Sequence, residues 1–316
     1  MTTHRTLNRR LGAGALALTT LAGLAGCGSG GSDARSAAPR SATSTTAVDP
    51  AQAKVTRQIS RLEATHRARI GAFAVDTGTG RTVSHRPDER FAFASTFKAM
   101  VCGAVLRKAR QSDPGLLDRV IHYTKEDLVE YSPVTEKHVD TGMTVADLCH
   151  AAITLSDNTA GNLVLRQVGG PAGLTAFFRS LGDRVSRSDR YETDLNIWKP
   201  GEVRDTTAPR PWAGNLRALT TGGALVPADR ERLIGWMKAS VTGDKRIRAG
   251  LPRNWTVGDK TGTGGTYGTA NDIAIAWPPS GAPLIIVITT NRFAPEAEAD
   301  DKAVAQTARI LAGALR

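Results

Sequence analysis

The stretch Ser95-Thr96-Phe97-Lys98 decides the fold, because strand-like periodicity ends before it and helical periodicity begins with it. Upstream, residues 50–66 have the spacing of an amphipathic helix. Residues 69–76 and 81–85 alternate like strands and are joined by the turn sequence Thr77-Gly78-Thr79-Gly80. The sequence therefore predicts a helix lying on a hairpin, followed by a change to helices at Ser95.

Downstream of this stretch the periodicity stays helical as far as about residue 241. The expected helices are 95–109, 144–155, 158–168, 171–181, 208–221 and 227–241. Residues 186–205 interrupt this pattern and are long for a structureless connection, which is typical of a functional loop.

Strand patterns return near the C-terminus at 255–262, 267–277 and 284–291, and a last helix is expected over 298–314. Strands at both chain ends with helices between them predict a two-domain α/β fold. An antiparallel sheet flanked by helices is expected from residues 48–90 and 243–316, and an all-helical domain from residues 91–242. The sequence has no internal repeats.

The N-terminus reads as an export signal over residues 1–26, with three arginines and then an apolar run too short to span a bilayer. It ends Leu24-Ala25-Gly26-Cys27, and a small-residue run before Cys is typical of a lipoprotein signal with lipid on Cys27. An ordinary cleavage site is the alternative. The pair Arg9-Arg10 also fits twin-arginine export. Residues 27–47 have the composition of a flexible tether.

The formal net charge is +11, and loss of the signal removes three positive charges. Nucleic-acid binding is not expected, because the cations are dispersed among acids and aromatics are only 5%. No histidine or cysteine spacing suits a metal, and no cofactor is expected. With Cys27 lipidated, Cys102 and Cys149 remain, each seven residues from a candidate serine; they are expected to form a disulfide, with two buried thiols as the alternative.

Four polar signatures carry the chemistry, and the first two place hydroxyls beside nitrogen groups. Lys98 lies one helical turn after Ser95, where its amine can take the serine proton. In Ser156-Asp157-Asn158, the serine can pass a proton to a leaving nitrogen while the asparagine holds a substrate amide. Taken alone, Ser95 reads as a helix cap and the triplet as a capping turn.

The other two signatures add an anion site and a water site. Lys260-Thr261-Gly262 closes a strand and is followed by Thr263, whose backbone N–H can complete an oxyanion site while Lys260 and the hydroxyls receive a carboxylate. Glu192 and Asn196 are four residues apart, so one helical turn can aim both at a single water. A surface strand end and a solvated loop glutamate are the alternatives.

Together the four signatures resemble those of the class A serine β-lactamases, and the resemblance covers residues 48–316. It implies a β-lactam hydrolase with Ser95 as nucleophile, Lys98 as its partner, Ser156 as proton relay and Glu192 as the deacylation base. Asn158 and Asn196 are implied as positioning residues. A D,D-peptidase would lack Glu192, and a lipoprotein that senses penicillin without turnover would be expected to have a transmembrane segment.

The resemblance extends to residues around these signatures. It implies that Tyr131 walls the cleft, that Arg190 and Asp205 close the Glu192 loop by a salt bridge, and that Cys102 and Cys149 pair. Many members have an arginine near Ala270, so Arg246 is expected to bind the substrate carboxylate instead. Positions 94 and 264 lack the cysteines of certain carbapenem-hydrolysing members. The expected partners are penicillins, and also cephalosporins. The protein is expected to be a monomer held at the outer face of the cell membrane by the lipid on Cys27.

Overall fold

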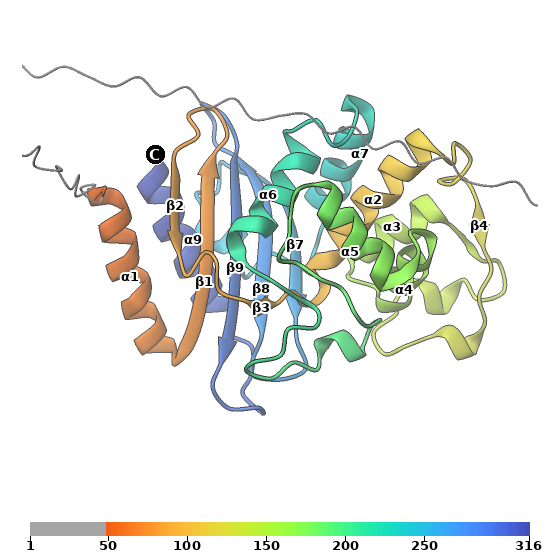
Figure 1. Ribbon diagram of the computed structural model, residues 1–316, viewed down its shortest axis with the longest axis horizontal. Coiled ribbons are helices and arrows are strands. Elements are labelled where there is room, and N and C mark those ends of the chain that lie inside the picture. Colours follow the sequence, from red (N-terminus) through yellow and green to blue (C-terminus); the bar gives the residue numbers. More distant parts are fainter. Residues whose placement is uncertain (1–48) are drawn as a thin grey trace, which may run out of the picture. The chain divides into compact units, whose positions relative to one another are not determined.

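The computed structural model describes residues 49–316, which belong to one compact unit built around a five-stranded antiparallel sheet (Figure 1). The strand order is β2-β1-β9-β8-β7. Both chain ends contribute, as the sequence predicts, through β1 (Ala68–Asp76), β2 (Thr82–His85), β7 (Thr256–Thr263), β8 (Ala270–Trp277) and β9 (Leu284–Arg292).

The central strand β9 divides its side chains between two hydrophobic cores, one on each face of the sheet. Ile285 and Val287 join the core under the helical block, whereas Leu284, Ile286 and Ile288 join the core under the terminal helices. Successive side chains of a strand point to opposite faces, so a strand buried on both faces is apolar throughout. The sheet is therefore the layer shared by both halves of the protein.

The terminal helices cover one face of the sheet and the helical block covers the other (Figure 1). The first group contains α1 (Pro50–His66), α8 (Ile247–Gly250) and α9 (Asp301–Leu315). The second contains α2 (Phe97–Gln111), α3 (Val145–Thr154), α4 (Asn158–Gln167), α5 (Gly170–Ser180), α6 (Pro209–Thr220) and α7 (Pro227–Lys238).

Side-chain caps fix where several helices start. Asp49, Thr144, Asp157 and Asp300 each accept a hydrogen bond from a backbone N–H in the first turn of α1, α3, α4 and α9. Such a cap satisfies a donor that the helix itself leaves free. The cap on α4 places the Ser156-Asp157-Asn158 signature at the junction between two helices.

The helical block differs from the all-helical prediction in two short antiparallel strand pairs. These are β3 (Phe91–Ala92) with β6 (Thr206–Thr207), and β4 (Val120–Ile121) with β5 (Met143–Thr144). Single 3₁₀ turns also occur: η1 (Ala94–Thr96), η2 (Lys125–Asp127), η3 (Thr135–Lys137) and η4 (Asp194–Asn196). Two-residue strands have no periodicity to detect in a sequence.

Two further differences concern the ends of elements. The helix expected from Ser95 starts as the turn η1 and becomes α-helical at Phe97, and the strand expected from Tyr267 starts at Ala270. Within the described residues, no helix is both long enough and apolar enough to cross a membrane. The export signal, the tether and Cys27 lie outside the described residues.

Candidate active site

Ser95 lies in the turn η1, directly before α2, at the point where strand β7 passes the helical block. The preceding residue, Ala94, has a φ of +44°, a left-handed conformation that is unusual for a residue with a side chain. Ser95 is itself 6% exposed. Lys98 follows one turn later, and its Nζ lies 2.9 Å from the Ser95 Oγ. The structure therefore brings the predicted nucleophile and its partner into contact.

Lys98 is fully buried and is surrounded by acceptors. Its Nζ donates to Asn158 Oδ1 at 2.5 Å and to the Ser156 carbonyl at 2.9 Å, and lies 3.0 Å from Glu192 Oε1. Burial lowers the pKa of Lys98 because it disfavours the charged amine, while the charge of Glu192 acts in the opposite direction. A lysine in this environment gives up its proton at a lower pH than an exposed one.

Glu192 faces Ser95 from the loop between α5 and α6. The Ser95 hydroxyl donates to Glu192 Oε1 at 2.7 Å, and Asn196 Nδ2 donates to Glu192 Oε2 at 2.5 Å. The turn η4 bends the chain so that Asn196, four residues after Glu192, faces the Glu192 side chain, as expected. Asn196 Oδ1 is buried with no protein donor in the described part of the chain. The carboxylate and the amide therefore share one small polar region beside the nucleophile.

Asn162 of α4 holds the backbone of Glu192, a contact that the sequence analysis missed. Its Nδ2 donates to the Glu192 carbonyl, and its Oδ1 accepts from the Glu192 N–H, both at 2.8 Å. The peptide bond between Glu192 and Thr193 is cis. Both backbone groups of Glu192 are thus fixed to a helix of the block, which orients its side chain.

The loop that carries Glu192 is closed at its base by the predicted pair of Arg190 and Asp205. Arg190 Nε lies 2.6 Å from Asp205 Oδ2, and the Asp205 carboxylate is fully buried. Its other oxygen accepts the backbone N–H groups of Asp189 and Arg190, at 2.7 and 3.0 Å. One carboxylate therefore joins the two ends of the loop.

The Ser156-Asp157-Asn158 signature crosses the floor of the cleft. Ser156 has a φ of +59°, and Lys260 Nζ donates to its Oγ at 2.9 Å. Asp157 is fully buried and accepts from the backbone N–H groups of Val134, Thr135 and Ala160, as expected for a residue that braces the backbone. The signature thus combines a half-buried catalytic candidate that lines the cleft with a fully buried support.

Strand β7 forms the opposite wall and approaches Ser95 closely. A side chain at Gly262 would lie 2.9 Å from the Phe93 carbonyl oxygen and 3.0 Å from the Ser95 nitrogen, so the position requires glycine. Lys260 is fully buried in the same strand. Burial and the nearby charge of Lys98 lower the pKa of Lys260 well below its usual range.

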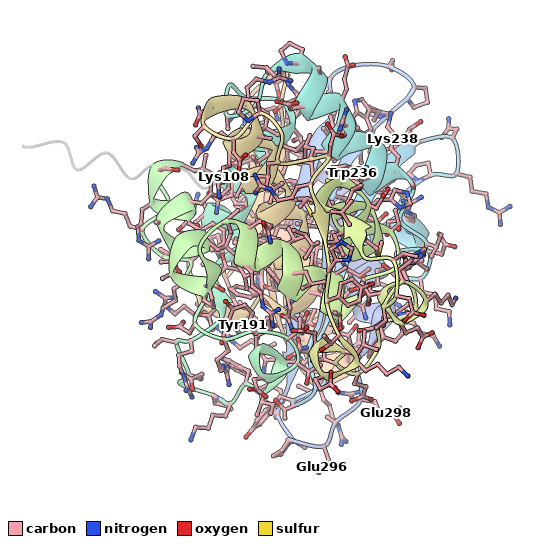
Figure 2. The ribbon with its side chains drawn as sticks, turned by 90° about the vertical axis from the view of Figure 1, so that its right-hand side faces the viewer. Lys108, Tyr191, Trp236, Lys238, Glu296 and Glu298 are labelled. Atoms are coloured by element: carbon pink, nitrogen blue, oxygen red, sulfur yellow. The ribbon has the colours of Figure 1, made fainter. Side chains whose placement is uncertain are left out.

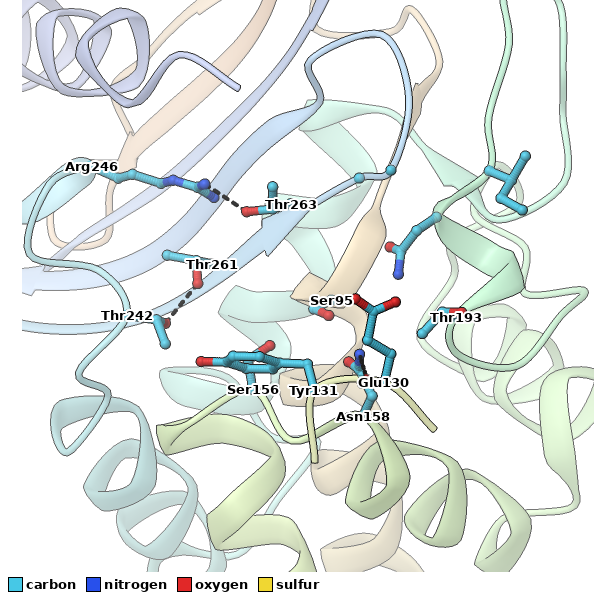
Figure 3. A pocket seen from close by; sticks show the side chains of 14 residues that line it. Ser95, Glu130, Tyr131, Ser156, Asn158, Thr193, Thr242, Arg246, Thr261 and Thr263 are labelled. Atoms are coloured by element: carbon cyan, nitrogen blue, oxygen red, sulfur yellow. Dashed lines mark hydrogen bonds between the residues drawn. The ribbon is translucent and has the colours of Figure 1, made fainter. Parts of the chain in front are cut away.

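Arg246 reaches the end of β7 from the segment before α8. Its Nη2 donates to Thr263 Oγ1 at 2.7 Å (Figure 3), and its Nη1 donates to the carbonyls of Gly262 and Asn271. Its Nε pairs with Asp301 at 2.7 Å. Ala270, in the region where the resemblance implies an arginine in many family members, is fully buried. The guanidinium therefore lines the cleft from outside the strand.

These walls enclose a cleft of about 530 Å³, whose lining includes Ser95, Ser156 and Arg246 (Figure 3). Tyr131 forms a further wall with its side chain 57% exposed, and its φ is +61°. Thr242, which the sequence analysis did not single out, donates to or accepts from Thr261 at 2.6 Å. An isolated threonine in a loop gives no sequence signal of this contact.

The predicted disulfide is absent. In the described part of the chain, Cys102 and Cys149 are both buried free thiols. They are neighbours, since the sulfur of Cys102 lies 3.8 Å from the carbonyl oxygen of Cys149. The two cysteines therefore lie close together where α2 meets α3, as expected from their seven-residue spacing to Ser95 and Ser156. Closeness alone does not determine whether the two thiols are oxidised.

Comparisons with known proteins agree with this geometry. A profile of the β-lactamase enzyme family matches residues 54–315. β-Lactamase AST-1 of Nocardia asteroides is 51% identical over 99% of this chain and 97% of its own length. An ancestral class A β-lactamase of known structure is 53% identical, with a TM-score of 0.79 over 82% of this chain and 99% of its own.

The chain belongs to the class A serine β-lactamases. A second relative of known structure, a β-lactamase of Streptosporangium roseum, has a TM-score of 0.82 and 59% identity over 83% of this chain and 98% of its own. This β-lactamase has, within residues 49–316, no group of three or more histidine, cysteine, aspartate or glutamate residues placed to hold a metal ion.

Proposed function

We propose that this enzyme opens β-lactam rings by acylation of Ser95 and releases the product with a water activated by Glu192. One observation carries the proposal: the Ser95 hydroxyl contacts both Lys98 Nζ, at 2.9 Å, and Glu192 Oε1, at 2.7 Å. The Ser95 oxygen accepts from a buried lysine and its hydroxyl donates to a carboxylate, which suits a two-step acyl transfer: a neighbouring base takes the serine proton, and the carboxylate then activates a water. Penicillins and cephalosporins are the substrates proposed for this site, and resistance to them is the biological outcome.

In acylation, the Ser95 oxygen attacks the lactam carbonyl and its proton passes to a neighbouring base. Ser156 Oγ lies 3.5 Å from Lys98 Nζ and 2.9 Å from Lys260 Nζ, so it stands between the two amines. The proton then reaches the lactam nitrogen through Ser156 as the C–N bond breaks. Relay by a positioned hydroxyl avoids release of a charged amide leaving group.

The negative charge on the carbonyl oxygen is received by the backbone N–H groups of Ser95 and Thr263. The close approach at Gly262 brings the two segments together, because a Cβ at this position would lie only 3.0 Å from the Ser95 nitrogen and glycine has none. Donors held in advance by a strand and a turn need no rearrangement as charge develops.

The substrate carboxylate binds at the far end of the same wall. Thr261 and Thr263 offer hydroxyls there, and Arg246 supplies positive charge, while the buried Lys260 lies behind them and donates to Ser156 Oγ. Arg246 is held by carbonyls of two strands and by Asp301, so its position is fixed before the substrate arrives. A preorganised cation loses little freedom on binding an anion.

In deacylation, a water bound between Glu192 and Asn196 attacks the ester. Glu192 removes one proton from this water, and Asn196 Oδ1 is a free acceptor for the other. Ser95 then recovers its proton as the acid product leaves. This step separates the proposal from a D,D-peptidase and from a penicillin sensor without turnover, since neither needs a carboxylate at this position.

The export route and location belong to the same proposal. The signal at residues 1–26 directs export, and a lipid on Cys27 holds a monomeric enzyme at the outer face of the cell membrane. This part rests on the sequence alone. Mass spectrometry of the membrane fraction, with Cys27→Ala as the comparison, tests it through the presence or absence of the lipid.

Intact-mass spectrometry of residues 48–316 with a penicillin, together with absorbance of the lactam amide, tests the chemistry. Wild type should remove the absorbance while carrying a transient adduct, and Glu192→Gln should accumulate the adduct, with deacylation slowed roughly 100-fold or more. Glu202→Gln, in the same loop and outside the cleft, should behave like wild type. Normal turnover by Glu192→Gln, or a permanent adduct on wild type, contradicts the proposal.

A further inference from the structure

The outer surfaces of α1 and α9 carry a set of exposed cations that the catalytic site does not use. They are Lys54, Arg57 and Arg61 on α1, and Lys302 and Arg309 on α9; we call these five the basic face. Their spacing puts those of each helix on one side, opposite the residues that pack on the sheet. None of the five forms an ion pair with a residue of the described part of the chain.

Acids do not balance this face. Glu63, the acid of α1, points toward the hairpin, where Arg86 Nε lies 2.8 Å away. Asp301, the acid of α9, is paired with Arg246 beside the cleft. Glu296 and Glu298 precede α9 and lie at the lower end of the molecule in Figure 2. Of the two acids that cap these helices, Asp300 lies 2.8 Å from His66 and Asp49 accepts the N–H of Ala51 at the start of α1. The five cations of the basic face therefore outnumber the acids beside them.

The two helices lie side by side and run in opposite directions. His66, at the end of α1, lies 2.8 Å from Asp300, which caps the start of α9. The start of α1 and the end of α9 are therefore at the same end of the layer (Figure 1). An α-helix rises about 1.5 Å per residue, so the face extends for roughly 25 Å. This length suits contact with an extended surface better than with a single small anion.

A hollow of about 620 Å³ continues the basic face at the end of α9. Its lining includes Arg309, the exposed Arg253 and the half-buried ring of Trp255. Arginine binds phosphate through a fork of N–H donors, and tryptophan favours the boundary between apolar and polar layers of a membrane. The hollow can therefore bind one lipid phosphate group more deeply than the exposed surfaces of the helices can.

We propose that the basic face docks the enzyme on an anionic phospholipid surface. The chain direction supports a membrane as the partner, because Cys27 precedes the first residue of α1 by 23 residues and the chain enters α1 beside this surface. The choice of a membrane rests on the proposed lipid at Cys27. Vesicle binding is measured on protein without lipid, so the two proposals fail separately.

Docking through this face leaves the cleft open. The cleft is lined by residues of η1, α4, η4 and β7, of loops and of the segment before α8, and none of its lining residues comes from α1 or α9. The sheet lies between the basic face and the core that contains α2. A docked enzyme is therefore held in one orientation with its cleft accessible to substrates, rather than rotating freely on a tether.

The test compares two charge-matched variants of residues 48–316, a region whose counterpart is nearly the whole solved chain of the Streptosporangium roseum relative. The first changes Lys54, Arg57, Arg61 and Arg309 to Gln. The control changes Lys125, Lys137, Arg217 and Arg232, which are exposed on the helical block, to Gln. Co-sedimentation uses vesicles of phosphatidylcholine with about 40% phosphatidylglycerol, a composition of about three neutral lipids to two anionic lipids.

Wild type and the control should bind these vesicles, and neither should bind phosphatidylcholine alone. The first variant should lose on the order of 100-fold or more in partitioning, since each cation near an anionic surface contributes about fivefold. Salt at about five times the usual ionic strength should release wild type. Both variants should hydrolyse a penicillin at the wild-type rate, which shows that they are folded.

Three results overturn the proposal. If wild type fails to bind the anionic vesicles, the basic face is not a docking surface for lipid. An equal loss of binding in the control variant assigns the effect to net charge instead of to this face. If the protein binds soluble polyphosphate more tightly than it binds the anionic vesicles, the partner of the basic face is a polyanionic polymer of the envelope rather than a lipid surface.

Discussion

Neutralising Asp205 should separate the two halves of the reaction. The Asp205→Asn change leaves the shape of the side chain but removes the buried charge that faces Arg190 Nε at 2.6 Å. If the oxygen of the new asparagine keeps accepting the two backbone N–H groups, its NH₂ group faces Arg190 Nε, so two hydrogen-bond donors oppose each other. Breaking a buried pair by removing one partner costs about 3–5 kcal/mol. Arg190 is 20% exposed, so we expect about 3 kcal/mol.

The loss should appear both in stability and in one chemical step. About 3 kcal/mol corresponds to a decrease in Tm of roughly 6–12 °C for a domain of this size. Glu192 lies two residues beyond Arg190, and a displacement of about 1 Å at a reacting group costs roughly 100-fold in rate. Deacylation should therefore slow about 100-fold. Acylation should change less than about tenfold, because Ser95 and Lys98 lie outside the loop.

Calorimetry and rapid-quench mass spectrometry measure these two effects. Asp88→Asn is the matched control, because Asp88 pairs with Arg210 at the surface with side chains 67% and 51% exposed. Such pairs contribute about 1 kcal/mol or less. If Asp205→Asn keeps the wild-type Tm and deacylation rate, the buried pair does not position the Glu192 loop.

Three more outcomes follow from the site. Gly262→Ala should slow acylation by roughly 100-fold, because its methyl group would press on the nucleophile's turn; single-turnover acylation with a penicillin measures this, and an unchanged rate contradicts it. In Glu192→Gln, acylation should rise with pH at values below the usual range of lysine, because burial lowers the pKa of Lys98; a pH profile tied to an ordinary lysine pKa contradicts this. Cys102 and Cys149 should be thiols that react with an alkylating agent only after unfolding, because both are buried. Mass spectrometry of the alkylated protein measures this, and a disulfide between the two residues contradicts it.

The sequence predicted the fold and most of the site because both are written in local patterns. The sheet follows from strands at the two chain ends, and Ser95, Ser156, Glu192 and Lys260 each stand in a short polar signature. Ser95 and Ser156 directly precede helices, Glu192 lies in a loop, and Lys260 interrupts the apolar pattern of β7, so each signature stands out from the periodicity around it.

Contacts that depend on tertiary packing could not be predicted. Asn162 lies inside α4 and resembles any polar helical residue, yet it holds both backbone groups of Glu192. Thr242 becomes part of the site only because its loop packs against β7. The pairing of Cys102 and Cys149 was wrong for a related reason, since neighbouring positions do not establish a covalent bond.

The position of Arg246 restricts the mutational paths open to this enzyme. Ala270 lies directly opposite Thr263 in the sheet, and Arg246 contacts the Thr263 hydroxyl. Directly opposed side chains start about 5 Å apart, so an arginine introduced at Ala270 would place a second guanidinium beside the first in a buried setting. Moving the guanidinium from position 246 to position 270 by single substitutions must therefore pass through a protein with two repelling cations, or through one with neither. We expect the first to be less stable and the second to bind a substrate carboxylate more weakly, so the arrangement built on Arg246 is hard to exchange one residue at a time.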